Sequence, residues 1–319
     1  MSEPVIGEPV VRAGFAAVIG APNAGKSTLV NRLVGSKVSI VTPKVQTTRF
    51  NVRGVVMDGP VQIVLVDTPG IFKPRRRLDR SMVRAAWSGA DDADVVVHLV
   101  DSQAEVAIAA GKATGADKMC VEDRIQITER LKGAGRQAIL ALNKVDHMRR
   151  DTLLALSQQL YETGVYSEVF MISSATGSGV DDLIHRLSEL MPEGPWLYPE
   201  DQSADVPMRV LAAEVTREKI YLRLHQELPY AAAVETTSYA EHPKGGVRIE
   251  QTIYVERENQ RPIVLGKAGQ TLKWIGQKSR EELTELLGQP VHLFLHVKVD
   301  ARWAERRELY AGMGLEFDS

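Results

Sequence analysis

The loop between residues 20 and 27 restricts most strongly what this chain can fold into. It reads GAPNAGKS, a GxxxxGK[ST] pattern that follows the apolar run AAVI and precedes a helical stretch from Ser27 to Val34. Such a loop needs a strand before it and a helix after it, because its glycines let backbone amides wrap phosphates and the helix N-terminus adds positive potential. The first part of the chain is therefore predicted to be an α/β P-loop NTPase fold.

The rest of this region, up to about Leu190, agrees with that prediction. Short β-branched runs alternate with helix-length amphipathic stretches, which is typical of a mainly parallel sheet covered by helices on both faces. The continuous apolar runs indicate burial on both faces. The expected strands span residues 16–19, 61–67, 93–101, 137–143 and 168–173. The alanine-rich stretch Ser102–Val121 has no clear period, and we expect a surface loop there.

Two positions of the loop and one later aspartate suit a nucleoside triphosphate with magnesium. Lys26 is expected to reach the β- and γ-phosphate oxygens, and Ser27 to hold Mg²⁺. Asp67 begins the sequence DTPG at the end of an apolar strand, where it can face the metal from the second side. The residues expected around the phosphates are Gly20, Ala21, Pro22, Asn23, Ala24, Gly25, Lys26, Ser27, Thr28, Asp67, Thr68, Pro69 and Gly70.

The sequence NKVD at residues 143–146 predicts which base is bound. The Asp146 carboxylate can accept hydrogen bonds from N1–H and the exocyclic amine of guanine, whereas adenine presents an acceptor at N1. After the next expected strand, Ser174 and Ala175 can place a backbone N–H near the guanine O6. We therefore expect GTP and GDP as ligands, contacted by Asn143, Lys144, Asp146, Ser174 and Ala175.

Thr47 and Thr48 lie between the loop and Asp67, where a segment must sense the γ-phosphate. A hydroxyl there can bind Mg²⁺, so this segment is expected to become ordered with GTP; the pattern does not distinguish the two threonines. The expected metal ligands are Ser27, Thr47, Thr48 and Asp67, and the expected catalytic residues are Lys26, Thr48, Asp67 and Gly70.

The position after DTPG is Ile71, where a Ras-like enzyme has a water-positioning Gln. We therefore hypothesise slow intrinsic hydrolysis of GTP to GDP and phosphate, which a partner or a monovalent cation such as K⁺ near Asn23 accelerates.

The C-terminal region predicts a smaller α+β domain. A Pro-rich, acidic stretch at residues 191–207 indicates a linker. It is followed by an expected helix (208–225), two strands joined through Gly245–Gly246, a helix-turn-helix around Gly266 with a second helix from about Gln277, and a strand at 290–299.

The turn of that helix pair has the sequence GKAG between apolar flanks. In the KH arrangement such a GxxG turn lets four backbone nucleotides pass close by; a helix-turn-helix packing motif is the alternative reading. Lysines and an arginine nearby supply local positive charge. The expected RNA-binding residues are Gly266, Lys267, Ala268, Gly269, Lys273, Lys278 and Arg280.

Composition adds exclusions. The net charge of −2 gives no overall attraction to nucleic acid, so RNA contact must come from this local patch. The single cysteine, Cys120, makes no intramolecular disulfide, and no apolar run approaches the roughly 18 residues that cross a bilayer. A cytoplasmic location is expected.

Six segments, in this order, resemble the Era-like family of bacterial GTPases, within the TrmE-Era-EngA superfamily: GAPNAGKSTLVN, QTTR, DTPGIFKP, NKVD, VTREKIYLRLHQELPY and GKAGQTLKWIG. The resemblance covers nearly the whole chain. It implies a Ras-like G domain and a type II KH domain, which we place at residues 12–190 and 208–300, with a linker at 191–207 and a C-terminal extension at 301–319. The family commonly has GKGG at the KH turn, and we expect Ala268 to be tolerated because it is small.

The resemblance also implies a function. Members of the family bind small-subunit (16S) ribosomal RNA near its 3′ end and act in maturation of the 30S subunit, and some associate peripherally with the inner membrane. We expect a monomer with these partners. The alternatives are a GTPase coupled to tRNA modification, which needs another domain in place of the GxxG module, and a membrane-associated signalling GTPase, which needs a lipid anchor or a basic amphipathic helix.

Overall fold

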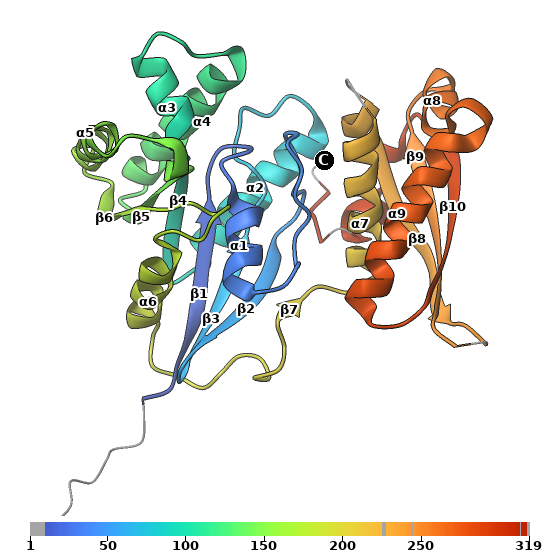
Figure 1. Ribbon diagram of the computed structural model, residues 1–319, viewed down its shortest axis with the longest axis horizontal. Coiled ribbons are helices and arrows are strands. Elements are labelled where there is room, and N and C mark those ends of the chain that lie inside the picture. Colours follow the sequence, from blue (N-terminus) through green and yellow to red (C-terminus); the bar gives the residue numbers. More distant parts are fainter. Residues whose placement is uncertain (1–9, 225–227, 244, 313, 318–319) are drawn as a thin grey trace, which may run out of the picture. The chain divides into compact units, whose positions relative to one another are not determined.

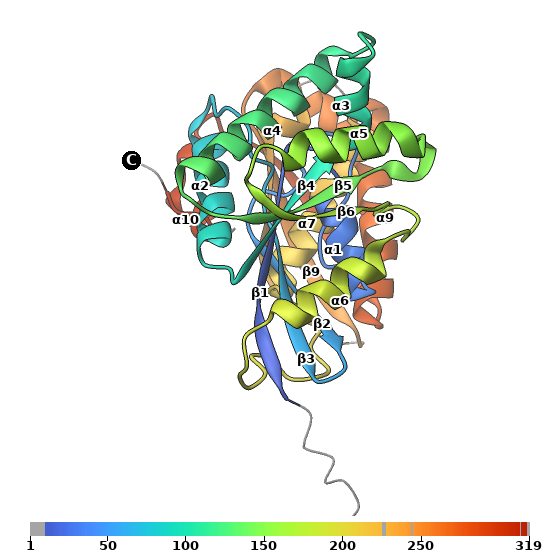
Figure 2. The same cartoon turned by 90° about the vertical axis from the view of Figure 1, so that its left-hand side faces the viewer.

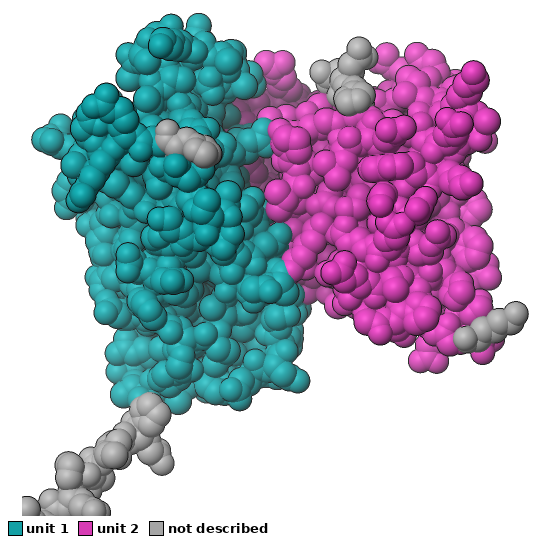
Figure 3. Space-filling model, viewed as in Figure 1, with its two compact units in different colours: residues 1–36, 52–68, 87–205 teal, residues 37–51, 69–86, 206–319 magenta. Residues whose placement is uncertain are grey.

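In the computed structural model of the protein, residues 10–224, 228–243, 245–312 and 314–317 are described, and they divide into two compact units (Figure 3). The described part of unit 1 comprises residues 10–36, 52–68 and 87–205. Unit 2 comprises 37–51, 69–86 and the described residues from 206 onward. Unit 2 thus includes two short segments from the first third of the sequence. The boundaries expected from the sequence stay a prediction.

A sheet with the strand order β6-β5-β4-β1-β3-β2-β7 forms the centre of unit 1 (Figure 1). Strands β1, β3, β4, β5 and β6 run parallel, while β2 is antiparallel to both β3 and β7. The expected mainly parallel sheet is confirmed. The strands are β1 Arg12–Ile19, β2 Val52–Asp58, β3 Val61–Asp67, β4 Val95–Asp101, β5 Ala138–Asn143, β6 Tyr166–Met171 and β7 Ala204–Asp205.

Helices α1 and α6 pack against strands β2 and β3 of this sheet, α5 packs against β6, and α3 packs against α4 and α5 (Figure 2). The side chains of β3 are buried along the whole strand, as its apolar run indicated. The helices of this unit are α1 Lys26–Val34, α3 Ser102–Ala109, α4 Gly115–Gly133, α5 Arg150–Tyr161 and α6 Val180–Leu190, with a short 3-10 turn at Val145–His147. Helix α2 Arg77–Asp91 belongs to unit 2 up to Ala86 and to unit 1 from Trp87.

The expected surface loop at Ser102–Val121 is wrong, because α3 and the start of α4 occupy this stretch. Side-chain hydrogen bonds at the helix N-termini explain these two helices better than the spacing of their apolar residues does. The Asp101 side chain accepts hydrogen bonds from the first amides of α3, and Thr114 and Asp117 form a reciprocal capping box at the start of α4. Alanines provide helix propensity without an apolar stripe, so the period was weak.

The sequence reasoning also missed β2. Gly54 and charged residues interrupt its apolar character, so the strand depends on its neighbours: β3 pairs with it over its full length, and β7 pairs with its other edge at Arg53 and Gly54. The stretch expected to be a linker therefore contributes a strand to unit 1 in its last residues.

Unit 2 contains a three-stranded sheet of order β10-β9-β8, with helices α7, α8 and α9 packed on it (Figure 1). Strands β8 and β9 are antiparallel, and β9 and β10 are parallel. The expected α-β-β-α-α-β order is confirmed. The elements are α7 Met208–Arg223, β8 Ala232–Glu241, β9 Val247–Val255, α8 Arg261–Leu265, α9 Gln270–Leu287, β10 Val291–Val299 and α10 Arg307–Gly312.

Two helix boundaries in unit 2 bear on the sequence predictions. The second helix of the pair begins at Gln270 and not near Gln277, with the non-helical Gly269 as its N-cap directly after the turn. The expected end of α7 at His225 lies outside the described residues.

The core beneath the helices includes Ile220, Leu224, Ile253, Val264 and Ile275, all buried. No described helix has the length and apolar character needed to cross a membrane.

Candidate nucleotide site and RNA interface

The loop between β1 and α1 is built on glycine conformations. Gly20 has φ 156° and Gly25 has φ 103°, both in the range that disfavours other residues. A Cβ at Gly25 would lie 2.3 Å from Nδ2 of Asn143, and one at Gly20 would lie 2.4 Å from the carbonyl oxygen of Leu99. Both positions therefore require glycine on steric grounds, because any side chain there would collide with a neighbouring strand or loop.

Lys26 lies at the start of α1 with only 6% of its surface exposed. Its Nζ donates to the carbonyl oxygens of Gly20 and Ala21, at 3.1 and 3.0 Å. Burial lowers the pKa of Lys26 to about 8, and the charge of Asp67 offsets part of this effect. A buried ammonium group held mainly by neutral carbonyls is suited to an anion, and the residues here fit a polyphosphate.

Asn143 joins three of the predicted motifs. Its Nδ2 donates to the carbonyl oxygen of Ala24 at 2.7 Å. Its Oδ1 accepts two hydrogen bonds from Ser174, one from the backbone N–H at 2.8 Å and one from the side-chain hydroxyl at 3.0 Å. Arg32 of α1 donates to the carbonyl oxygens of Ser174, at 2.7 Å, and of Ala175. The bonds of Asn143 are buried, and with those of Arg32 they tie the loop at residues 20–27 to the loops that follow β5 and β6.

Asp146 is oriented by a residue that the sequence reasoning missed. The hydroxyl of Ser173 donates to Oδ1 of Asp146 at 2.7 Å. Lys144 has φ 65° and its Nζ pairs with Asp101, at the end of β4. The signal for Ser173 was its position directly before Ser174 and Ala175. Nothing in the spacing pointed to Arg32.

The metal-binding residues expected from the sequence fall in different units. Ser27 and Asp67 belong to unit 1, where the Asp67 side chain is fully buried at the end of β3 and Thr68 Oγ1 donates to the carbonyl oxygen of Val18 at 2.8 Å. A carboxylate and a hydroxyl are the hard oxygen ligands that Mg²⁺ prefers, so these two residues fit that ion. Thr47 and Thr48, and also Pro69 and Gly70, belong to unit 2.

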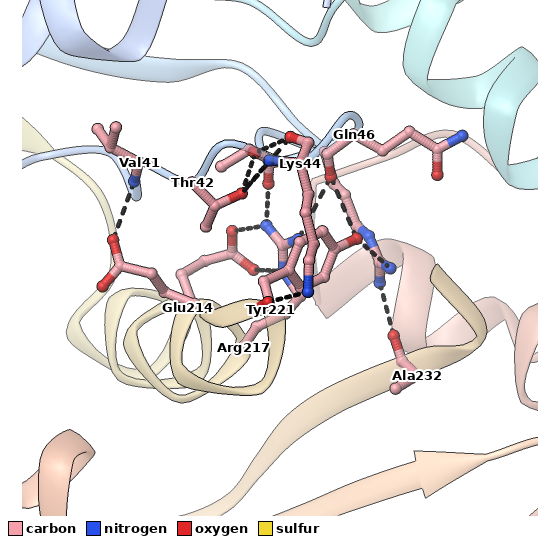
Figure 4. A network of polar contacts seen from close by, with 11 residues as sticks. Val41, Thr42, Lys44, Gln46, Glu214, Arg217, Tyr221 and Ala232 are labelled. Carbon is pink, nitrogen blue, oxygen red and sulfur yellow. Dashed lines mark hydrogen bonds and ion pairs between the residues drawn. The ribbon is translucent and has the colours of Figure 1, made fainter. Parts of the chain in front are cut away.

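The segment that contains Thr47 and Thr48 is folded against α7 (Figure 4). The Thr47 hydroxyl lies 2.7 Å from the Thr42 hydroxyl and donates to the carbonyl oxygen of Lys44 at 2.7 Å. Gln46 has φ 57°, which a non-glycine residue adopts only at an energetic cost. Thr48 is buried.

The GxxG turn contains three residues with positive φ, namely Gly266, Ala268 and Gly269. Gly266 has φ 74°, and a Cβ there would lie 2.2 Å from Oγ1 of Thr271. Ala268 has φ 51° and ψ 31°. The small size of alanine is therefore not enough to explain why Ala268 is tolerated. Its left-handed backbone conformation costs about 1 kcal/mol of folding free energy that glycine would not incur.

The predicted basic residues around this turn are exposed, but they differ in how they are paired. Lys267 and Lys273 flank the turn and the start of α9. Lys278 forms an ion pair with Glu281 at 2.7 Å, and Arg280 helps to lower the pKa of that carboxyl group after Lys278 and Gln277. Lys267 and Lys273 thus place exposed positive charge in the turn itself and at the start of α9.

Comparison with known protein families gives two matches. The family described as 50S ribosome-binding GTPase matches residues 15–144, and the KH domain family matches residues 227–304. The GTPase Era of Caulobacter vibrioides is 67% identical over 307 residues, which cover 96% of this chain and 97% of that protein. The GTPase Era of Maricaulis maris is 63% identical and covers 96% of this chain and 98% of that protein.

Solved structures give the same result for the fold. An Era variant of Aquifex aeolicus bound to GDP and aluminium fluoride has a TM-score of 0.84 at 36% identity, covering 95% of this chain and 99% of that one. Era in complex with MgGDPNP and nucleotides 1506–1542 of 16S ribosomal RNA has a TM-score of 0.83 with the same identity and coverage.

Proposed function

The chain belongs to the Era family of GTPases, and from this premise we propose that it is a GTP-controlled switch that binds 16S ribosomal RNA near its 3′ end and assists maturation of the 30S subunit. The KH match and the left-handed GxxG turn carry the RNA part of the proposal. The relative that was solved with the 3′ segment of 16S ribosomal RNA supports this choice of RNA.

The nucleotide part rests on the cradle formed by the loop at residues 20–27 and by Asn143, Asp146 and Ser174. We propose that the loop amides and Lys26 bind the phosphates, while Asp146, oriented by Ser173, accepts from guanine. Ser27 and Asp67 would hold Mg²⁺, together with Thr47 or Thr48. The ion would neutralise charge on the phosphate oxygens.

Hydrolysis lacks an obvious water-positioning side chain, because Ile71 follows DTPG and is buried. We propose that K⁺ near Asn23, whose φ of 62° turns the loop backbone at that point, accelerates the reaction. The test is the turnover rate in K⁺ against Na⁺ at equal ionic strength. Equal rates would refute the cation proposal and leave acceleration to a partner, such as the 30S subunit.

We further propose a cytoplasmic monomer that contacts the inner membrane peripherally. This rests on the family resemblance alone. Flotation with anionic vesicles at low and high salt tests the membrane contact, and recovery of the protein only in the unbound fraction at low salt would refute it.

The central experiment measures binding to an oligonucleotide of the 16S 3′ end, with GDP and with a non-hydrolysable GTP analogue. The variant Lys267→Asp/Ala268→Asp places two acidic side chains on the exposed turn without the clash that a side chain at Gly266 would cause. Asp also tolerates the left-handed conformation of position 268. Lys298→Asp, an exposed position on β10, is the matched control.

The expected result is tighter binding with the analogue, which is lost in the double variant and kept in the control. Equal binding by all proteins in every nucleotide state would refute RNA recognition by the turn.

A further inference from the structure

The segment at residues 37–51, which we call the sensor segment, is tied to α7 by buried charged groups. Arg217 of α7 is only 2% exposed and forms an ion pair with Glu214. It donates to the carbonyl oxygens of Gln46, at 3.4 Å, and of Thr47 (Figure 4). Burial acts to lower the pKa of Arg217, but Glu214 outweighs it and raises the pKa. A permanently charged group thus holds the backbone next to both candidate threonines.

The next residue of α7 holds the other end of the sensor segment. Glu218 is 3% exposed, and its carboxylate accepts from the backbone N–H of Val41 at 2.9 Å and from Nζ of Lys37 at 2.8 Å. Lys219 of α7 pairs with Glu218, and Glu282 of α9 pairs with both Lys37 and Lys219, so two acids and two lysines form one cluster. Burial alone would raise the pKa of Glu218, yet the bonds from Lys219 and Lys37 keep it below its ordinary value.

The sensor segment in turn binds the end of α7. Lys44 Nζ donates to the carbonyl oxygens of Tyr221 and Leu224, where the helix terminates and its unpaired carbonyls attract cations. Arg49 is fully buried and donates to the carbonyl oxygen of Ala232 at 3.1 Å and to the hydroxyl of Tyr221 at 3.3 Å. The attachment therefore runs along the helix and continues to the first strand of the KH sheet.

These contacts have a mechanical consequence. A rearrangement of Gln46–Thr48 around a γ-phosphate must either break the bonds to Arg217 or carry α7 along. Breaking them would leave buried donors without partners, which is unfavourable. In both cases the state of the sensor segment and the position of the helix that starts the RNA-binding region depend on each other.

We propose that Arg217 and Glu218 are positioning residues that couple the γ-phosphate to RNA affinity by fixing the sensor segment to α7. The proposal rests on the proposed function, since it assumes that GTP and RNA bind to the same chain, and it names the residues through which the nucleotide controls the KH region. Neither residue touches nucleotide or RNA in this account. Both act through the sensor-segment backbone.

The experiment compares Arg217→Gln and Glu218→Gln with the control Arg223→Gln in the full chain. Arg223 lies on the same helix but stacks on Trp274 of α9. For each protein, affinity for the 16S 3′ oligonucleotide is measured with GDP and with a non-hydrolysable GTP analogue. In the wild type we expect the analogue to increase RNA affinity at least tenfold over GDP, and we expect this ratio to fall below threefold in both variants and to stay within twofold of wild type in the control.

Two further readouts separate coupling from simple loss of structure. Because coupling is reciprocal, RNA should raise analogue affinity in the wild type by the same factor and should lose this effect in the variants. GDP affinity should change by less than twofold in every protein. In the nucleotide-free protein, amide hydrogen exchange across residues 41–48 should be faster in Arg217→Gln than in Arg223→Gln.

The outcomes are distinguishable. A wild-type ratio near one would refute GTP-gated RNA binding and this proposal with it. A normal wild-type ratio that the variants retain would overturn the coupling role alone and leave the proposed function intact. Unchanged exchange across residues 41–48 would overturn the attachment itself. Partial recovery of the ratio in Arg217→Lys would support the role of a cation at this position.

Discussion

The guanine-nucleotide cradle of unit 1 and the sensor segment of unit 2 are held in different ways. The cradle depends on glycine backbone and on neutral hydrogen bonds centred on Asn143, within one unit. The sensor segment depends on charged side chains, above all Arg217 and Glu218, within the other. The two regions differ accordingly: neutral bonds within unit 1 hold the proposed cradle, while ionic side chains attach the sensor segment, proposed to respond to the third phosphate, to helix α7.

The largest expected effect is the loss of nucleotide affinity when base recognition in the cradle is removed. In Asp146→Asn an amide replaces one acceptor by a donor facing guanine, so affinity for GDP should fall by two to three orders of magnitude, or about 3 to 4 kcal/mol. Xanthine nucleotides, which present a carbonyl at C2, should gain affinity. Titration of fluorescent GDP and XDP tests this. Retention of GDP affinity within threefold would show that Asp146 does not read the base.

The next effect tests whether backbone alone shapes the cradle. Gly25→Ala should lose about 2 to 3 kcal/mol of unfolding free energy and most nucleotide affinity, because its Cβ would clash with Asn143 and φ is positive. Gly35→Ala is the matched control: φ is 74°, but nothing lies within 4 Å of its Cβ, so about 1 kcal/mol is expected. Urea unfolding and nucleotide titration check both. Equal costs would mean that the contact with Asn143 is readily relieved.

A smaller effect tests the charged attachment of the sensor segment. Glu218→Gln should cost about 1 to 2 kcal/mol at pH 7. Since the folded pKa of Glu218 lies below its ordinary value of 4.5, its stabilisation is present above that pH and is lost as pH falls through the folded pKa. The stability difference between wild type and variant should therefore shrink as the pH is lowered from 7 to values below 4.5. A difference that stays constant over this range would contradict an ionic role, and Gly25→Ala should show no such pH dependence.

The smallest effect concerns the KH turn. Ala268→Gly removes about 1 kcal/mol of left-handed strain but adds about 0.5 kcal/mol or more of unfolded-chain freedom, so a net stabilisation of up to about 0.5 kcal/mol is expected. Thermal unfolding measures it. In Ala155→Gly, at an exposed position inside α5, the same change should destabilise by about 1 kcal/mol. A loss of stability in Ala268→Gly would show that other contacts of this turn favour alanine.

Much of the fold and of the candidate site was predictable because the motifs are local. The glycines at 20 and 25 follow β1, Asp67 ends β3 and Asn143 ends β5, and parallel strands bring their carboxyl ends to one edge. The GxxG turn was recognisable for the same reason, since its flanking helices adjoin it. Where the pattern was weak, at α3 and β2, capping side chains or a neighbouring strand supplied the stability.

The sequence by itself determined the fold class of both regions, the phosphate loop and the motif that selects guanine. Only the tertiary structure decided how Asp146 is oriented by Ser173, and which helix holds the sensor segment. Arg217 is 170 residues from Thr47, and Glu218 is 177 residues from Val41. Contacts over such separations follow from how the elements pack, and an arginine or glutamate on a helix has the same local signature whether it faces solvent or a distant backbone.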